Sequence, residues 1–267
     1  STLGRTMLRL EDASAGRIWF DNEEITAYSE RRMRPLRTRL QMIFQDPYAS
    51  LNPRQRIGDL LAEPLIAHRM AGREEAHRNV DRLLELVGLP RSGRSRYPHE
   101  FSGGQRQRIG IARALTLRPE LIVCDEPVSA LDVSIQAQIL NLLQDLQREL
   151  KLTYVFIAHG LGAIRYISTR IAVMYLGKIV ELADSRSLFE APKHPYTKML
   201  LDADPIADPR LRNRGKSIPE GDLPNPANPP MGCRFHTRCP YAQAECRVKE
   251  PDLSGGLHAV ACHYPLR

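Results

Sequence analysis

The sequence predicts an α/β fold built on a parallel sheet, and three observations support this. A short apolar run at residues 121–124 leads directly into Asp125 and Glu126, as expected for a strand buried on both faces of a parallel sheet. Residues 134–150 have apolar side chains at helical spacing, and a second apolar run then ends at His159. Strand, helix and strand in this order form a right-handed crossover, so both acids and the histidine should lie at one edge of the sheet.

The remaining elements are expected from β-forming runs, helical periodicity and turn residues. Residues 17–26 and 39–45 are rich in β-formers and are expected to be strands. From residue 57 to about residue 88 the pattern is helical, ending at a glycine followed closely by a proline. A hairpin is expected at residues 170–183 and a helix near residues 185–203, followed by a Pro-, Asp-, Arg- and Asn-rich stretch typical of a linker or an extended arm.

Length, composition and charge limit the class of protein. The 267 residues, 42% of them hydrophobic, are enough for one large domain with an appendage. No run approaches the ~18 consecutive apolar residues of a membrane-spanning helix, and the first residues do not form a secretion signal, so a cytoplasmic protein is expected. The net charge of +7 would suit nucleic acid or an anionic membrane surface. The arginine clusters lack interleaved aromatic residues, which favours a solvated basic face and no nucleic-acid partner.

A glycine-containing helix start forms the first chemical motif. Ser102, Gly103, Gly104 and Gln105 precede an apolar-periodic run and are expected at a helix N-terminus. Unpaired backbone N–H groups, a hydroxyl and the helix dipole make such a terminus a site for anions, and glycines let a phosphate approach the backbone. An ordinary capped helix explains the same residues when they are considered alone.

Acidic, imidazole and amide side chains follow the expected strands. Asp125 and Glu126 end one strand, and Asp132 opens the next helix. A carboxylate in this position can hold Mg²⁺ through water, and a neighbouring one can orient or deprotonate an attacking water. Each acid could instead cap a helix, and His159 could be a buried structural histidine. Gln45 closes the strand at residues 39–45 and offers a neutral oxygen to a metal or a water.

In order and spacing, these segments resemble the ABC transporter ATPase family. Residues 101–105 are similar to its signature motif, residues 121–126 to the Walker B strand, and residues 129–132 to the D-loop, while Gln45 and His159 match the Q-loop glutamine and the switch histidine. Five motifs in the correct order make the resemblance specific.

The resemblance implies a RecA-like P-loop NTPase core at residues 1–203, with a helical subdomain at about residues 50–118. A small irregular extension with four cysteines is expected at residues 204–267. ATP and Mg²⁺ are the implied cofactors. The implied partner is a second ATPase subunit, identical or different, whose signature motif closes over the bound ATP.

The resemblance also assigns roles to individual residues. Glu126 would polarise the attacking water and His159 would contact the γ-phosphate, so these two are the expected catalytic residues. Nucleotide and Mg²⁺ would be bound by Ser1, Thr2, Gln45, Ser102, Gly103, Gly104, Gln105, Asp125 and Asp132. Among these, Ser1, Gln45 and Asp125 are the expected Mg²⁺ ligands, with Asp125 acting through water.

The sequence departs from the family pattern at two places. Ser1 and Thr2 match the last residues of the phosphate-binding loop, whose lysine and glycines are absent from the sequence, and residues 1–8 resemble a helix already under way. The ATPase domain is therefore expected to be incomplete at its N-terminus, and this chain alone is expected to bind ATP poorly. Gly160 stands where the family usually carries aspartate, a carboxylate expected to tie the switch loop to the dimer partner.

The C-terminal part resembles the tail of oligopeptide and dipeptide importer ATPases, through residues 194–197 and 232–240, and residues 52–54 fit the same subfamily. This implies an ATPase that energises peptide import from the cytoplasmic face of the membrane, bound peripherally to permease subunits by residues 45–70. A substrate-binding protein outside the membrane would be an indirect partner. The alternatives are a non-hydrolysing remnant that acts as a scaffold, or import of nickel or another small solute. An ATPase acting on nucleic acid is disfavoured, because the chain has no coiled-coil insertion or second cassette.

Five cysteines are present, and four of them crowd into the last 35 residues. Cys124 lies alone in the apolar run, whereas Cys233, Cys239, Cys246 and Cys262 have the spacing C-x5-C-x6-C-x15-C. Disulfides are disfavoured in a reducing cytosol, and zinc sites usually contain closer cysteine pairs. A structural 4Fe-4S cluster, which some members of the resembled subfamily carry, is favoured over zinc, with unliganded thiols as the third alternative.

Overall fold

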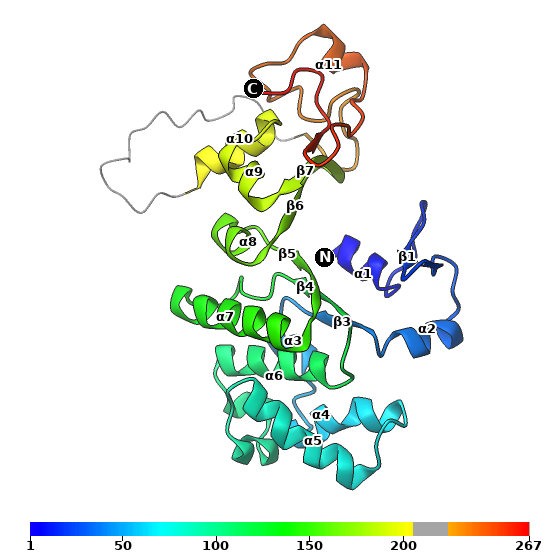
Figure 1. The fold of residues 1–267 in the computed structure, drawn as a ribbon, viewed down its shortest axis with the longest axis vertical. Coiled ribbons are helices and arrows are strands. Elements are labelled where there is room, and N and C mark those ends of the chain that lie inside the picture. Colours follow the sequence, from blue (N-terminus) through cyan, green and yellow to red (C-terminus); the bar gives the residue numbers. More distant parts are fainter. Residues whose placement is uncertain (205–223, 267) are drawn as a thin grey trace. The chain divides into compact units, whose positions relative to one another are not determined.

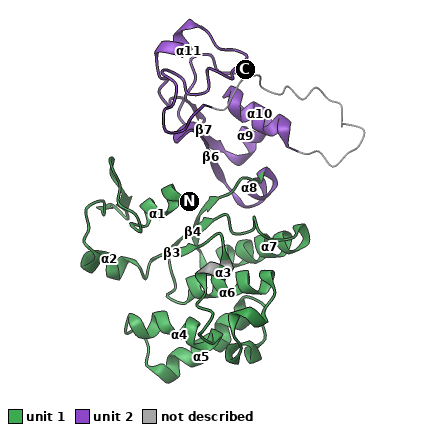
Figure 2. Ribbon diagram, turned by 180° about the vertical axis from the view of Figure 1, so that it is seen from behind, with its two compact units in different colours: residues 1–160 green, residues 161–267 purple. Residues whose placement is uncertain are grey.

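The computed structural model describes residues 1–204 and 224–266, which divide into two compact units at residues 160 and 161 (Figure 2). Unit 1 contains, in chain order (Figure 1), α1 (Thr2–Met7), β1 (Trp19–Phe20), β2 (Glu23–Glu24), α2 (Glu30–Leu36), β3 (Leu40–Ile43), α3 (Pro47–Ser50), α4 (Ile57–Ala67), α5 (Arg73–Leu86), two short 3₁₀ helices (Arg91–Ser95 and Pro98–Glu100), α6 (Gly103–Leu115), β4 (Leu121–Asp125), α7 (Val133–Leu150) and β5 (Thr153–Ile157). Unit 2 contains α8 (Leu161–Ile167), β6 (Arg170–Tyr175), β7 (Lys178–Asp184), α9 (Ser185–Glu190), α10 (Pro195–Ala203), α11 (Ala244–Val248) and β8 (Ala259–Val260).

A parallel sheet in the order β3-β4-β5 forms the centre of unit 1. Its middle strand is the most apolar, and Ile122, Val123 and Cys124 are fully buried there. Burial raises the pKa of the Cys124 thiol far above its usual range, so this cysteine is a packing residue. The predicted crossover is confirmed, because α7 connects β4 to the parallel neighbour β5.

Two expected elements are divided in the structure, and one helical region is resolved into its helices. The strand expected at residues 17–26 is a short hairpin, β1 and β2, because Asp21 and Asn22 adopt φ of 51° and 64° and make a tight turn. The helical pattern from residue 57 to residue 88 forms α4 and α5, with Arg69 in the left-handed conformation between them. The helix expected near residues 185–203 is two helices, α9 and α10.

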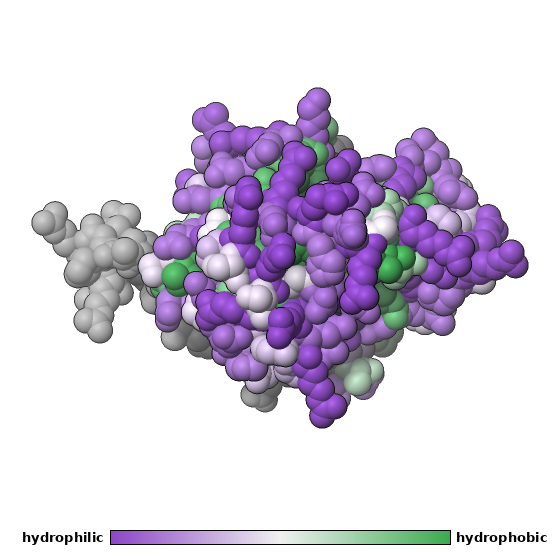
Figure 3. Space-filling view, turned by 90° about the horizontal axis from the view of Figure 1, so that it is seen from below, coloured by the Kyte–Doolittle hydropathy of each residue, from purple (hydrophilic) through white to green (hydrophobic). Residues whose placement is uncertain are grey.

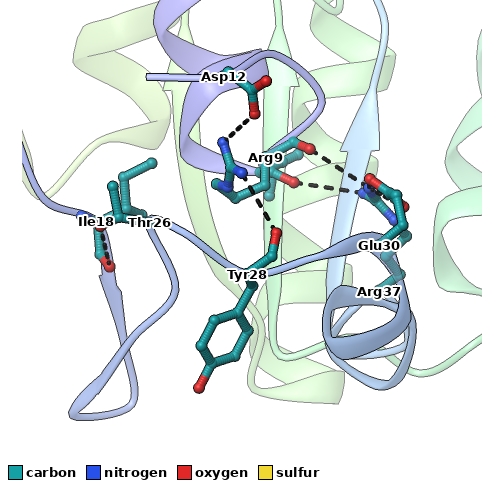
Figure 4. Close-up of polar contacts among 8 residues, drawn as sticks. Arg9, Asp12, Ile18, Thr26, Tyr28, Glu30 and Arg37 are labelled. Carbon is teal, nitrogen blue, oxygen red and sulfur yellow. Dashed lines mark hydrogen bonds and ion pairs between the residues drawn. The ribbon is translucent and has the colours of Figure 1, made fainter. Parts of the chain in front are cut away.

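Arginine side chains hold the C-terminal end of α1, as Figure 4 shows. Arg37 donates to the backbone oxygen of Arg9 at 3.4 Å and pairs with Glu30 at 2.8 Å. Arg9 in turn donates to the backbone oxygen of Tyr28 at 3.4 Å. Guanidinium groups complement the partial negative charge at a helix C-terminus, so these contacts stabilise α1 in place. Ser1 is the N-cap residue at the other end of this helix.

Unit 2 has an antiparallel sheet in the order β6-β7-β8, which confirms the predicted hairpin. Its α10 helix starts at the segment 194–197 for a local reason. His194 is the N-cap, with Nδ1 accepting from the Tyr196 N–H at 3.0 Å, and Pro195 occupies the first helical position. Burial lowers the pKa of His194 to about 4, which keeps the ring neutral and Nδ1 able to accept.

A buried carboxylate joins three segments of unit 2. Glu181, on β7, is fully buried and accepts hydrogen bonds from the Lys193 N–H at 2.7 Å and the His194 N–H at 3.0 Å. His258 Nε2, next to β8, lies 2.6 Å from the same carboxylate. A buried carboxylate is stable only when such donors replace the water that it loses. Glu181 therefore connects the hairpin both to the start of α10 and to the C-terminal segment.

Gly232 is required by the backbone of the cysteine-bearing segment, and its replacement tests the packing there. It has φ of +71°, and a Cβ would lie 2.4 Å from the Cys246 oxygen. Gly232→Ala should destabilise unit 2 by roughly 3 kcal/mol or more, as left-handed strain and overpacking add. Gly256 has a similar φ of +66° with nothing within 4 Å, so Gly256→Ala should cost only the strain, about 1–2 kcal/mol. Equal losses in thermal unfolding of the two variants would contradict the steric account.

Hydrophilic side chains dominate the face seen from below in Figure 3, where apolar groups are small and scattered. None of the helices in residues 1–204 and 224–266 is long and apolar enough to cross a membrane.

Candidate functional site

The predicted polar residues meet at the carboxyl ends of the parallel strands. Asp125 is the last residue of β4 and lies opposite Ile157 of β5 in the sheet register. Gln45 follows β3 by two residues, and His159 follows β5 by two residues. Because the three strands are parallel neighbours, their ends share one edge of the sheet. The structure therefore brings residues distant in sequence to one place, as the sequence predicted for the acids and the histidine.

Glu126 is the centre of this group, which we call the strand-end cluster (Gln45, Asp125, Glu126 and His159). Gln45 Nε2 donates to Glu126 Oε2 at 2.9 Å, and His159 Nε2 lies 3.0 Å from Glu126 Oε1. The Glu126 side chain is 14% exposed and that of His159 90% exposed, so His159 is an accessible side chain rather than the buried structural histidine considered from the sequence. A carboxylate held in this way can orient a water and accept a proton from it.

Asp125 is suited to an external cation. It is 2% exposed, and its Oδ1 atom is buried without a hydrogen-bond partner. The backbone nitrogen of Ser1 lies 3.5 Å from this oxygen, so the start of α1 is beside the carboxylate. Ser1 and Thr2 add hydroxyl groups and Gln45 an amide oxygen, and such oxygen donors are the ligands that Mg²⁺ prefers. A buried carboxylate oxygen that makes no hydrogen bond and lies beside the start of α1 fits a hydrated Mg²⁺ ion.

The second predicted group of residues starts α6. Ser102 is the N-cap, with its Oγ accepting from the Gln105 N–H at 3.3 Å and its own N–H donating to Gln105 Oε1 at 3.0 Å. Ser102, Gly103 and Gln105 are exposed to solvent. The capped-helix explanation is therefore correct as a local description, and it leaves this turn accessible to a ligand or a partner.

The two glycines of that turn serve different purposes. A Cβ at Gly104 would lie 2.6 Å from Ile135 Cγ2, so Gly104 allows α6 and α7 to pack closely. A Cβ at Gly103 would lie 3.6 Å from Leu131, an ordinary contact distance. Ile135 was part of the apolar stripe in the sequence, but its contact with Gly104 could be found only from the packing of the two helices.

Asp132 occupies the N-cap position of α7 but makes no capping hydrogen bond with its side chain. Its carboxylate is exposed. Asp132 therefore occupies the position of a helix cap, but its side chain does not act as one. Asp132 lies next to Val133, which is 82% exposed although it is apolar.

The cysteines give no support to the predicted metal centre. Cys233, Cys239, Cys246 and Cys262 line one small cavity of unit 2, which has a volume of about 10 Å³ and so room for about one water. Burial raises the pKa of Cys233 and Cys239, and that of Cys262 to about 11. Within residues 1–204 and 224–266, no group of three or more His, Cys, Asp or Glu side chains is placed to hold a metal ion. The described residues therefore give no support to the predicted 4Fe-4S cluster.

Comparison with known families identifies two matching regions. Residues 1–129 match the family model described as ABC transporter. Residues 180–246 match the model described as oligopeptide/dipeptide transporter, C-terminal region. The first match includes the strand-end residues Gln45, Asp125 and Glu126, and the second includes Glu181 and three of the four clustered cysteines.

Curated proteins resemble the chain over almost its whole length. The oligopeptide transport ATP-binding protein AppF of Bacillus subtilis (strain 168) is 52% identical, and the match covers 98% of this chain and 81% of that protein. The oligopeptide transport ATP-binding protein OppF of Salmonella typhimurium is 51% identical over 98% of this chain and 79% of that protein.

Solved structures of ATP-binding cassettes resemble the fold. The ATP-binding cassette MJ0796, in a dimeric post-hydrolysis state with ADP and Pi, matches 69% of this chain and 80% of that chain, with a TM-score of 0.62 and 26% identity. CbiO1 from Clostridium perfringens, part of the transporter complex CbiONQ, matches 71% of this chain and 74% of that chain, with a TM-score of 0.64 and 27% identity.

Proposed function

The chain belongs to the ATP-binding subunits of ABC transporters, in the oligopeptide/dipeptide branch, and on that basis we propose that it hydrolyses ATP to drive peptide import through a membrane permease. The observation that carries the proposal is the similarity to oligopeptide transport ATP-binding proteins over 98% of the chain, together with the strand-end cluster. The family membership supports ATP hydrolysis, and the C-terminal match supports peptides as the transported class.

The strand-end cluster supports a hydrolytic mechanism. ATP supplies the phosphoanhydride, and bound Mg²⁺ neutralises its charge. Ser1, Gln45 and Asp125 would hold Mg²⁺, with Asp125 acting through water; the buried Asp125 oxygen makes no hydrogen bond within the chain. Glu126 would orient the attacking water and accept its proton, because it directly follows the middle strand and lies next to Asp125.

His159, two residues after β5, would contact the γ-phosphate through its exposed ring. It shares the Glu126 carboxylate with Gln45, so the histidine lies beside the expected water-orienting acid. Gly160 follows it, and a Cβ added at this glycine would meet no other atom within 4 Å. The aspartate that the family usually carries at Gly160 would therefore fit without a clash, and its absence leaves the loop without one negative charge.

A second ATPase subunit would complete the nucleotide site. Ser102, Gly103 and Gln105 are exposed at the N-terminus of α6, where backbone N–H groups and the helix dipole favour a phosphate. The exposed Asp132 and the exposed apolar Val133 lie at the neighbouring start of α7 and suit contact with that subunit. The dimeric MJ0796 cassette provides a structural precedent for such an assembly.

A permease would dock by residues 45–70. Ser50 of this segment also lines a cavity of about 270 Å³ beside β3. Gln107 borders the same cavity, is 1% exposed, and has its Nε2 buried without a hydrogen-bond partner. The exposed Tyr48, over which the Arg106 guanidinium lies at 4.9 Å, adds an apolar contact surface. Peripheral attachment to the cytoplasmic face of the membrane follows from this docking, and the substrate-binding protein would act through the permease.

The two parts of the chain would have different roles. Residues 1–203 would form the ATPase domain, with the helical subdomain at about residues 50–118, and residues 204–267 the extension; residues 205–223, which belong to it, lie outside the described residues. The extension would have a structural role.

Iron and sulfide analysis of anaerobically purified protein tests for a cluster, and bound iron and sulfide in a stoichiometric amount would show that the thiols rearrange to bind one.

Uptake measurements in cells test the transported class. Deleting the gene should abolish ATP-dependent uptake of a labelled oligopeptide, and the full-length gene should restore it. Nickel uptake, measured in the same cells, should be unchanged. Loss of nickel uptake with normal peptide uptake would favour the small-solute alternative, and normal uptake of both would favour the scaffold alternative.

A further inference from the structure

The geometry assigns Gln45 to a positioning role: its side-chain amide donates to Glu126 and orients that carboxylate for the water, in addition to any contact with the metal. The inference rests on the proposed function, because it concerns how the hydrolytic carboxylate is held. Gln45 would affect hydrolysis by orienting the Glu126 carboxylate, and not by binding the phosphates.

The first support is the pair of contacts on the Glu126 carboxylate. Gln45 Nε2 donates to Oε2 at 2.9 Å, while His159 Nε2 lies 3.0 Å from Oε1. Gln45 follows β3 and His159 follows β5, so the two side chains approach Glu126 from the neighbouring strands on either side of β4. Each carboxylate oxygen is therefore held by one side chain, which fixes the plane of the carboxylate.

The second support is the fixed backbone of Glu126. This residue has φ of 47°, a left-handed conformation that is costly for a side-chain-bearing residue. Its N–H donates to the Ile157 oxygen at 2.9 Å, and its own oxygen accepts from Ser129 Oγ at 3.1 Å. With the backbone anchored on both sides, only the side-chain torsions remain to be set. Gln45 is placed to set them.

The third support is the polarity of the Gln45 amide. Its nitrogen can only donate, and it faces a carboxylate oxygen that can only accept. The carbonyl oxygen of the same amide is the end that suits Mg²⁺. One planar group would thus contact both the metal and Glu126. A ligand that draws Gln45 toward the metal would move the Glu126 carboxylate as well.

A single substitution separates the positioning role from metal binding. Gln45→Glu keeps an oxygen ligand for Mg²⁺ and removes the N–H donor, placing a second carboxylate against Glu126. In the full-length ATPase assembled with its permease, we expect kcat to fall about 10- to 100-fold, as for loss of an orienting partner. The KM for ATP and the Mg²⁺ concentration for half-maximal rate should stay within twofold. A residue that acts only as a metal ligand would give the reverse pattern.

Gln144→Glu is the matched control. Gln144 lies on α7, where its Oε1 accepts from Arg148 Nη2 at 2.7 Å. The substitution makes the same chemical change away from the strand-end cluster and should leave kcat within twofold. Equal losses in the two variants would show a general charge effect and overturn the assignment.

A double-mutant cycle and a direct readout complete the test. Gln45→Ala should lower the single-turnover rate about 10-fold alone but add less than twofold in a Glu126→Gln background, because the group it orients is gone. In nucleotide-free protein, Glu126→Ala should shift the NMR resonances of the Gln45 side-chain amide. Additive rates, or unmoved amide resonances, would overturn the inference. If Glu126→Gln itself retained full turnover, the proposed function of Glu126 would fail instead.

Discussion

Replacing Glu126 by glutamine should abolish ATP turnover while leaving ATP binding intact. The glutamine keeps the size and the hydrogen-bonding capacity of the side chain but cannot accept a proton from water at neutral pH. General-base catalysis contributes about 10²- to 10⁴-fold to a rate, so kcat should fall by that factor. The measurement is phosphate release by the full-length ATPase assembled with its permease, with nucleotide binding measured on the same preparation. The strand-end geometry predicts this loss because Glu126 is the carboxylate held by both Gln45 and His159.

Glu149→Gln is the control for this change. Glu149 is an exposed residue near the C-terminal end of α7. Its substitution removes one negative charge without touching the strand-end cluster, so turnover should stay within twofold. Turnover by Glu126→Gln at more than a tenth of the normal rate would show that another group activates the water.

Replacing Glu181 by alanine should open the C-terminal segment of unit 2. The substitution leaves the Lys193 and His194 N–H groups and His258 without their shared acceptor in a buried position. Removing one partner of a buried ionic or hydrogen-bonded group costs about 3–5 kcal/mol. Hydrogen exchange at the Ala261 N–H, which donates to the Val180 oxygen at 2.8 Å, reports this opening. Its protection should fall by about 100- to 1000-fold.

Glu250→Ala provides the comparison. Glu250 pairs with Lys178 at 2.8 Å in the same unit, but both side chains are about half exposed. An exposed ion pair contributes only about 0–1 kcal/mol, so the Ala261 N–H should keep its protection to within about fivefold. Similar losses in the two variants would mean that Glu181 contributes no more than an exposed charge does.

The parallel core was predictable because its signals are local and strong. The apolar run before Asp125 and the periodic helix after it predict a crossover, and β4 and β5 are parallel neighbours in the structure. The same rule placed His159 near the acids. The direct contact between Gln45 and Glu126 was not predicted, because side-chain orientation at a strand end depends on neighbours 81 residues away in sequence.

The sequence was less informative where one residue alters a regular pattern. The left-handed conformations of Asp21 and Asn22 turn an expected strand into a hairpin, and the position of Arg69 between α4 and α5 was not predicted. The junction at Glu181 was also missed, since a lone glutamate in a hairpin is usually exposed and its partners come from distant segments. The cysteine spacing suggested a cluster, whereas the packing leaves space for about one water between the thiols.

The most direct test of the proposed site is a structure of the full-length Glu126→Gln transporter with MgATP. Mg²⁺ should be bound beside Asp125, with the γ-phosphate near His159 and the Ser102 turn of the second ATPase subunit against the same triphosphate. A triphosphate bound away from the ends of β3, β4 and β5, or a Mg²⁺ ion whose hydration shell makes no contact with Asp125, would contradict it.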